Sequence, residues 1–192
     1  MSTVDEAMSR YAQGEASAFA AVYDQVAPRL ERFLRRHMRE KTAVEDIVQQ
    51  TFLQMHNARG TFIIGAEVMP WAFAIARRLM IDSGRKLRRE ESFEMDGDDL
   101  AARLAAASPA GGLVASGEDM MRAEEARARL AAAFVGLTEP QRTAFELVKT
   151  EGLTHAEAAS ILGTTVTGIK LRVHRAYLTL RGALGEPAEE RR

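Results

Sequence analysis

The chain has 192 residues, of which 46% are hydrophobic, enough for one ordinary domain or two small ones with packed cores. It has no cysteine, which excludes disulfides, Cys-ligated zinc and thiol-based redox sensing. No apolar run is long enough to span a membrane, and the N-terminus lacks the basic and then apolar pattern of a signal peptide. We therefore expect a cytoplasmic protein without membrane insertion. Few aromatic residues and many Ala, Leu, Arg and Glu predict an all-α fold, in which Thr61–Ile64 is the only strand candidate.

The formal net charge of −1 conceals an uneven distribution of charge along the chain. The charge is −3 over residues 1–28, +7 over residues 29–89, −8 over residues 90–125 and +3 over residues 126–192. The acidic segment also contains the run SPAGGLVASG, which is typical of a flexible linker. We predict two small helical domains, residues 1–89 and 126–192, joined by a flexible acidic linker, residues 90–125.

Helical spacing of apolar residues organises the first domain. Phe19, Val22 and Val26 share one face, and the same spacing continues beyond Pro28. The pattern Thr42-x-x-Glu45 predicts a capping box at the start of the next helix, which should end near Asn57–Gly60. A loop over residues 59–69 follows. Pro70 suits the start of a further helix, which should run through Trp71–Ile81 into a basic tail.

The second domain carries three helix-start signals. A helix should restart at Glu118, and the pattern Thr138-Glu-Pro-Gln141 predicts a capping box for the next helix, which Gly152 should end. A third capping box, Thr154-x-x-Glu157, then opens the segment THAEAASILGTTVTGIKLRVHR.

This segment, residues 154–175, reads as two helices joined by a tight turn. Gly163 can supply positive φ at the turn, and Thr165 can cap the second helix. Ala158, Leu162, Ile169 and Val173 should form the apolar seam between the helices. The second helix is basic, with Lys170, Arg172, His174 and Arg175. The alternative is an αα-hairpin with a solvated basic face; the coincidence of Ala-x-x-x-Gly and the basic helix favours a DNA-binding helix-turn-helix.

The sequence offers no catalytic constellation. It has no Glu-x-x-His pair for a di-iron bundle, no His pair one helical turn apart and no Gly-rich phosphate loop. We therefore expect a protein that is not an enzyme and that needs no cofactor or metal.

Three motifs occur in a fixed order: AVEDIVQQTFLQMH, then PWAFAIARRLMID, then LTEPQRTAFELVKTEGLTHAEAASILGTTVTGIKLRVHRA. Together they resemble a bacterial extracytoplasmic-function (ECF) sigma factor of the sigma-70 family, over roughly residues 16–89 and 126–184. The resemblance implies core RNA polymerase and promoter DNA as partners, and an anti-sigma factor as a further partner.

The resemblance also implies three sites. The first motif would dock on core polymerase, through Glu45, Asp46, Gln49, Gln50 and Leu53. The second motif and the loop before it would bind the −10 element as its strands separate, through Phe62, Trp71, Arg77, Arg78, Arg85 and Lys86. The helix-turn-helix would read the −35 element, through Thr165, Thr167, Lys170, Arg172, His174 and Arg175.

Each site has a simpler alternative. Taken without the resemblance, the first motif reads as an ordinary solvated helix face, and Trp71 as a core residue. The acidic linker is either a solvated tether or an occupant of a positively charged groove on the polymerase. For the whole chain, the alternative is a stand-alone helix-turn-helix regulator whose first domain senses a signal or dimerises. Where the chain departs from the family, at Gln50, Arg78, Thr167-Gly168 and Leu171, we expect changes in docking strength or in the DNA sequence that is read.

Overall fold

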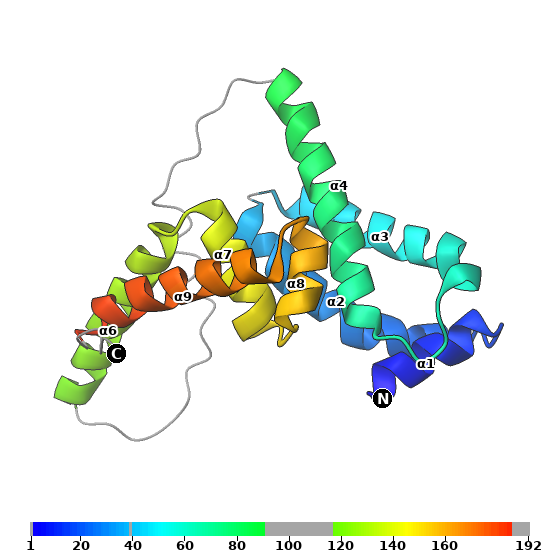
Figure 1. The fold of residues 1–192 in the computed structure, drawn as a ribbon, viewed down its shortest axis with the longest axis horizontal. Coiled ribbons are helices and arrows are strands. Elements are labelled where there is room, and N and C mark those ends of the chain that lie inside the picture. The colour runs from blue at the N-terminus through cyan, green and yellow to red at the C-terminus, as the bar shows by residue number, and fades with distance from the viewer. Residues whose placement is uncertain (1, 39, 91–116, 186–192) are drawn as a thin grey trace. The chain divides into compact units, whose positions relative to one another are not determined.

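The computed structural model describes residues 2–38, 40–90 and 117–185, and side chains within them except at residues 86–90 and 117–119. The described chain is helical and contains no strand, which confirms the predicted all-α class (Figure 1). It forms two compact units, one containing α1 to α4 and one containing most of the chain after residue 94. The predicted linker lies largely outside the described residues.

The first unit contains four helices and one 3-10 turn, η1. Their bounds are α1 Thr3–Ala12, α2 Ala18–His37, α3 Lys41–Ala58, η1 Arg59–Thr61 and α4 Val68–Glu90. The core is built from apolar residues of all four helices, such as Met8, Leu30, Met55 and Phe73, each 1% exposed or less. Each large apolar side chain buried in this way stabilises the fold by about 1.5–3 kcal/mol. Helix α2 runs through Pro28 without ending there.

The described elements that follow have the bounds α6 Gly117–Val135, α7 Glu139–Phe145, η2 Glu146–Thr150, α8 His155–Leu162 and α9 Val166–Ala183. Helix α9 packs on both α6 and α7. Arg142 closes the turn between α6 and α7, because its Nη2 donates to the carbonyl oxygens of Val135 at 2.9 Å and Leu137 at 3.0 Å. Those carbonyls would otherwise be unsatisfied at the helix end.

Several local predictions are confirmed. Helix α6 begins within one residue of the expected start, and Thr138 N donates to Gln141 Oε1 at 3.1 Å, as a capping box requires. Helix α7 continues as the π-helical turn η2, which ends before Gly152, a residue with φ of +73°.

One local prediction is wrong, and the one strand candidate does not form a strand. Helix α3 starts at Lys41 with Glu40 as its N-cap, so Thr42 lies inside the helix and forms no capping box. The Thr61–Ile64 run is not a strand: it contains the end of η1 and the beginning of the loop before α4. The N-cap of α3 lies two residues before Thr42, the position that the box pattern implies. The apolar loop residues Ile63 and Ile64 remain exposed instead of entering a sheet.

Candidate nucleic-acid and polymerase interfaces

The turn between α8 and α9 has the local geometry of a helix-turn-helix. Thr154 N donates to Glu157 Oε2 at 2.6 Å and Glu157 N donates to Thr154 Oγ1 at 3.2 Å, which confirms the capping box at the start of α8. Gly163 has φ of +60°, where it ends α8. Of the residues predicted to form the apolar seam, Ala158, Ile169 and Val173 are buried and Leu162 is half-buried.

Helix α9 turns one apolar face inward and a mixed polar and apolar face outward. Ile169, Val173 and Ala176 are buried, at the spacing of one helical face. The opposite face is exposed and carries four of the predicted DNA-binding residues: Thr167, Lys170, His174 and Arg175. Leu171 is exposed on the same face. Arg172 is half-buried at the flank of this face. The exposed face of α9 thus carries Lys170, His174 and Arg175 beside the exposed apolar residues Leu171 and Leu178.

The first turn of α9 explains the Thr167-Gly168 sequence. Thr165 Oγ1 accepts a hydrogen bond from Gly168 N at 3.0 Å, so Thr165 is the N-cap. A Cβ atom at position 168 would lie 3.0 Å from Thr164 Oγ1 and 3.2 Å from Thr165 Oγ1. Glycine therefore leaves room for the two threonine hydroxyl groups at the end of the helix that would approach DNA.

Helix α3 carries the predicted polymerase-docking residues on its solvent side. The buried residues of α3 are Val44, Ile47, Val48, Thr51, Phe52 and Met55. Between them in sequence lie the five predicted docking residues, all exposed: Glu45, Asp46, Gln49, Gln50 and Leu53. Glu45 pairs with Lys41 on the same helix at 3.5 Å. We call this exposed set the α3 face; it offers carboxylate and amide acceptors beside one apolar side chain, which is 52% exposed.

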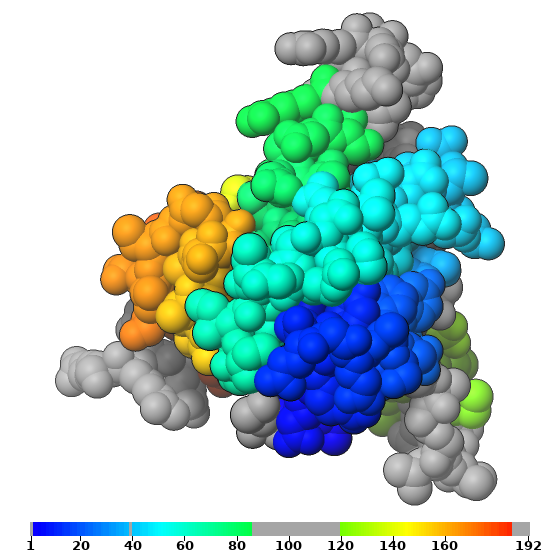
Figure 2. Space-filling model, turned by 90° about the vertical axis from the view of Figure 1, so that its right-hand side faces the viewer, coloured from blue at the N-terminus to red at the C-terminus, as the bar shows by residue number. Residues whose placement is uncertain are grey.

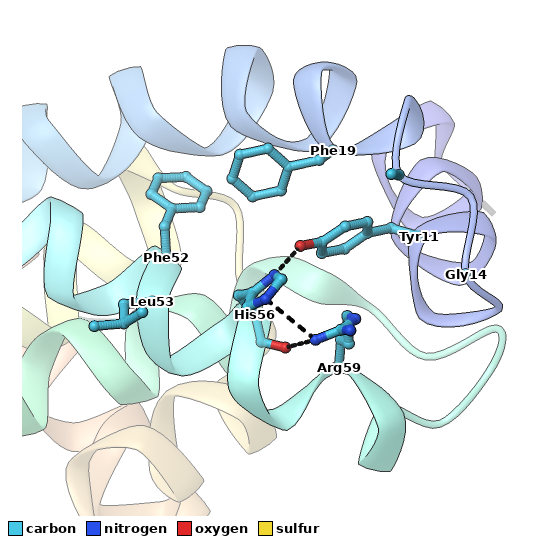
Figure 3. Close-up of a pocket in the computed structure, with 8 residues that line it drawn as sticks. Tyr11, Gly14, Phe19, Phe52, Leu53, His56 and Arg59 are labelled. Atoms are coloured by element: carbon cyan, nitrogen blue, oxygen red, sulfur yellow. Dashed lines mark hydrogen bonds between the residues drawn. The ribbon is translucent and has the colours of Figure 1, made fainter.

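A pocket lined by aromatic residues adjoins Leu53 (Figure 3). It has a volume of 540 Å³ and is lined by Tyr11, Gly14, Ala16, Phe19, Phe52, Leu53, His56 and Arg59. The Tyr11 hydroxyl is hydrogen-bonded to His56 Nδ1, and Arg59 Nη1 donates to the backbone oxygen of His56 at 2.7 Å. These polar contacts close one side of the pocket, while Phe19 and Phe52 form an apolar wall.

The loop between η1 and α4 brings two predicted −10 residues together. The ring centroids of Phe62 and Trp71 lie 5.3 Å apart, and both residues are half-buried. They line a second pocket of 220 Å³ with Thr61, Ile63, Ala66 and Glu67. Its volume is below the roughly 300–1,000 Å³ of pockets for drug-sized ligands, and so suits a single small aromatic group. We call it the loop pocket.

The predicted arginines of α4 do not converge on this pocket as one cluster. Arg77 is half-buried, whereas Arg78 is exposed and its Nη2 donates to Gln54 Oε1 of α3 at 2.5 Å. Arg85 is exposed and lies 3.8 Å from Asp82. Lys86 belongs to α4, but its side chain lies outside the described ones. The helix therefore presents separate cationic positions along its length, as contacts to a nucleic-acid backbone would need.

The sequence patterns did not reveal that helix α1 supports this loop. Asp5 Oδ1 accepts a hydrogen bond from Val68 N at 3.0 Å, and Ser9 Oγ accepts one from Gly65 N at 3.2 Å. Burial raises the pKa of the Asp5 carboxyl, but the hydrogen bonds from Val68 and Ser2 outweigh it and hold that pKa below its ordinary value. A signal was present, since Ser2-x-x-Asp5 matches a capping box and Val4, Ala7, Met8 and Tyr11 have helical spacing.

Two features are absent from the described part of the chain. No helix there is both long and apolar enough to cross a membrane. No group of three or more His, Asp or Glu side chains among the described residues is arranged to hold a metal ion.

The architecture defined by these sites is that of a two-part helical protein with a helix-turn-helix in its second part. Family models agree: sigma-70 region 2 matches residues 22–90, and sigma-70 region 4 matches residues 127–180. RNA polymerase sigma factor CarQ of Myxococcus xanthus is 31% identical over 179 residues, covering 93% of this chain and 96% of that protein. ECF RNA polymerase sigma factor SigK of Mycolicibacterium vanbaalenii is 30% identical over 185 residues, covering 95% of this chain and 89% of the relative.

Solved structures show the same fold. The sigma factor RpoE from Bartonella quintana, in complex with the anti-sigma factor NepR, matches with a TM-score of 0.63 and 24% identity, covering 88% of this chain and 98% of that one. CnrH, in complex with the cytosolic domain of CnrY, matches with a TM-score of 0.63 and 24% identity, covering 96% of this chain and 99% of that one. The chain belongs to the sigma-70 family, as an RNA polymerase sigma factor of the extracytoplasmic-function type.

Proposed function

We propose that this sigma factor divides promoter-directed initiation among three surfaces: the α3 face docks on core RNA polymerase, the loop pocket and α4 hold the −10 element, and the exposed face of α9 reads the −35 element. The observation that carries the proposal is that each family motif contributes an exposed, chemically distinct surface. The α3 face is rich in acceptors, the loop pocket is aromatic, and the α9 face is basic.

Docking through the α3 face follows from its chemistry. Two carboxylates and two amides on one helix face can accept hydrogen bonds from a basic partner helix, and Leu53 adds an apolar contact. The pocket beside Leu53 extends the same surface with aromatic walls, which suits an apolar side chain of the partner.

Strand opening would use the loop pocket. A base that leaves the duplex loses stacking, and an aromatic residue such as Phe62 or Trp71 can replace that stacking at about 1–3 kcal/mol for each base. Arg78 and Arg85 would hold the phosphates of the separated strand. Binding energy alone drives this opening, so we assign the protein no covalent chemistry.

A binding experiment tests whether the α3 face docks on core polymerase. The double charge reversal of Glu45 and Asp46 to Lys should weaken binding of the full chain to purified core polymerase by about tenfold or more. The matched control reverses Glu6 and Asp24, which are likewise exposed acids, on α1 and α2. Equal binding by the two variants would show that the α3 face is not the docking surface.

Family membership favours the sigma factor over a stand-alone regulator, and it motivates two further proposals. The protein acts in the cytoplasm, where polymerase and promoter DNA are found. It is held inactive by an anti-sigma factor, a partner of the kind that NepR is for RpoE. Affinity purification of the full chain from its native host should recover one stoichiometric protein in the absence of the inducing signal. Recovery of core polymerase alone, before and after induction, would contradict this proposal.

A further inference from the structure

Helix α1 lies outside the segment that matches sigma-70 region 2, which begins at residue 22, yet two of its side chains hold the loop before α4. Asp5 and Ser9 are both buried, each 6% exposed. They bond to the backbone N–H groups of Val68 and Gly65, two positions more than 50 residues further along the chain. In Figure 2 the dark blue surface of α1 lies directly against the turquoise surface that ends α3 and forms η1.

The bond to Val68 fixes the point at which α4 begins. The first backbone N–H groups of a helix have no partner within the helix, and a nearby carboxylate also interacts favourably with the helix dipole. Asp5 Oδ1 lies 3.0 Å from Val68 N. The Asp5 carboxylate therefore accepts a hydrogen bond from the first turn of α4 and also places a negative charge at the start of that helix. The other oxygen of the same carboxylate, Oδ2, accepts from Ser2 N at 3.1 Å and from Ser2 Oγ at 2.8 Å, so the Asp5 side chain is held from two directions.

The bond to Gly65 fixes the loop itself. Gly65 has φ of +85°, which makes the backbone turn sharply after the exposed residues Ile63 and Ile64. Ser9 Oγ donates its own proton to the backbone oxygen of Asp5 at 2.8 Å, which leaves its lone pairs free to accept from Gly65 N. Between the two anchored amides lie Ala66 and Glu67, which line the loop pocket.

We propose that Asp5 and Ser9 are positioning residues for promoter opening: they hold the loop so that the loop pocket stays open and Phe62 stays against Trp71. This inference rests on the proposed function of the loop pocket. The two side chains themselves touch no DNA. They act through the backbone of residues 65–68, and α1 is thereby a working part of the −10 site as well as a core helix.

The test uses the full-length protein with Ser9→Ala, which removes the acceptor of Gly65 N and leaves a good helix former in α1. Thr3→Ala is the matched control, because it deletes an exposed hydroxyl group from the same helix. The chain's single tryptophan, Trp71, reports on the loop in the free protein through acrylamide quenching of its fluorescence. Holoenzyme is assembled with core polymerase, and open complexes on promoters selected from genomic DNA are measured by permanganate reactivity of unpaired thymines.

We expect Ser9→Ala to raise the quenching of Trp71 and to lower open-complex formation about tenfold, with unchanged affinity for core polymerase. Thr3→Ala should match the wild type in all three measurements. Equal behaviour of Ser9→Ala and Thr3→Ala would overturn the inference. If the wild type opened no promoter at all, the proposed function would fail instead, and the quenching data would still decide whether Ser9 holds the loop.

A second pair of variants separates positioning from a general loss of stability. Asp5→Asn keeps an oxygen that can accept from Val68 N, whereas Asp5→Ala keeps none. Asp5→Asn should open promoters more readily than Asp5→Ala when the two are compared at a temperature at which both are fully folded. Equal losses in the two variants would show that the bond to Val68 does not position the loop.

Discussion

The aromatic rings of Phe62 and Trp71 lie with their centroids 5.3 Å apart and their planes at 41°, across the boundary between a loop and a helix. Phe62 leaves η1 with extended backbone, and Trp71 lies in the first turns of α4. Their contact gives the loop pocket an aromatic wall while both rings stay half-buried. Part of each ring is thus accessible for stacking with a base.

Phe62→Ala should therefore reduce the rate of promoter opening by about tenfold, because one stacking surface is worth about 1–3 kcal/mol for each base. Phe62→Trp should retain most of the activity, since it keeps a ring that can stack. Permanganate reactivity measured against time gives the rate. Opening by Phe62→Ala at the wild-type rate would remove Phe62 from the −10 site.

Replacing Lys170 and Arg175 together by Ala should weaken binding of the holoenzyme to duplex DNA upstream of the start site. If both side chains bind phosphates, the slope of log affinity against log salt concentration should fall by about one for each of the two cations removed. Fluorescence anisotropy at a series of salt concentrations measures this slope. Lys149→Ala is the control, because Lys149 is an exposed cation of the same unit outside α9. The same slope for the double variant and this control would contradict the assignment.

The carboxylate of Asp5 makes stability depend on pH. Hydrogen bonds keep the pKa of Asp5 in the folded protein below the ordinary 3.8 despite its burial. The unfolded chain therefore binds the proton more readily, so the stabilisation is complete above about pH 4 and is lost as the pH falls through the lowered folded pKa. The free energy of unfolding of the wild type should exceed that of Asp5→Asn at pH 7, and the difference should shrink below about pH 4. Urea unfolding at pH 7 and below about pH 4 measures the difference in the free energy of unfolding between the wild type and Asp5→Asn. The same difference at both pH values would rule out this linkage.

Gly84 and Gly65 should respond in opposite directions to substitution by alanine. Gly84 lies inside α4, and a Cβ atom added to it would meet no atom within 4 Å, so Gly84→Ala should stabilise the protein by about 0.5–1 kcal/mol. Gly65 has φ of +85°, so Gly65→Ala should destabilise it by about 1–2 kcal/mol. Thermal unfolding of both variants checks the prediction, and a stabilising Gly65→Ala would contradict it.

Much of this fold could be predicted from local patterns in the sequence. The boxes at Thr138 and Thr154, the cap at Thr165 and the turn at Gly163 follow from chemistry within a few residues, and the structure confirms each. The exposed faces of α3 and α9 likewise follow from helical spacing.

Contacts between distant segments could not be predicted in this way. Nothing in the local sequence connects Asp5 to Val68 or Gln54 to Arg78, because these pairs meet only after the helices have packed. At the π-helical turn Glu146–Thr150 the backbone hydrogen bonds change register. The spacing of apolar residues in the sequence does not reveal such a change. Helix α1 differs from these cases, since its capping box and helical spacing were both present in the sequence.

We propose that this protein directs core RNA polymerase to particular promoters through the α3 face. Run-off transcription with purified core polymerase, on promoters selected from a genomic pool, tests it most directly. We expect strong transcripts from a subset of promoters with the wild type, their loss when Glu45 and Asp46 are reversed to Lys, and their retention when Glu6 and Asp24 are reversed. No stimulation by the wild type on any promoter would show that the protein is not a promoter-directing factor.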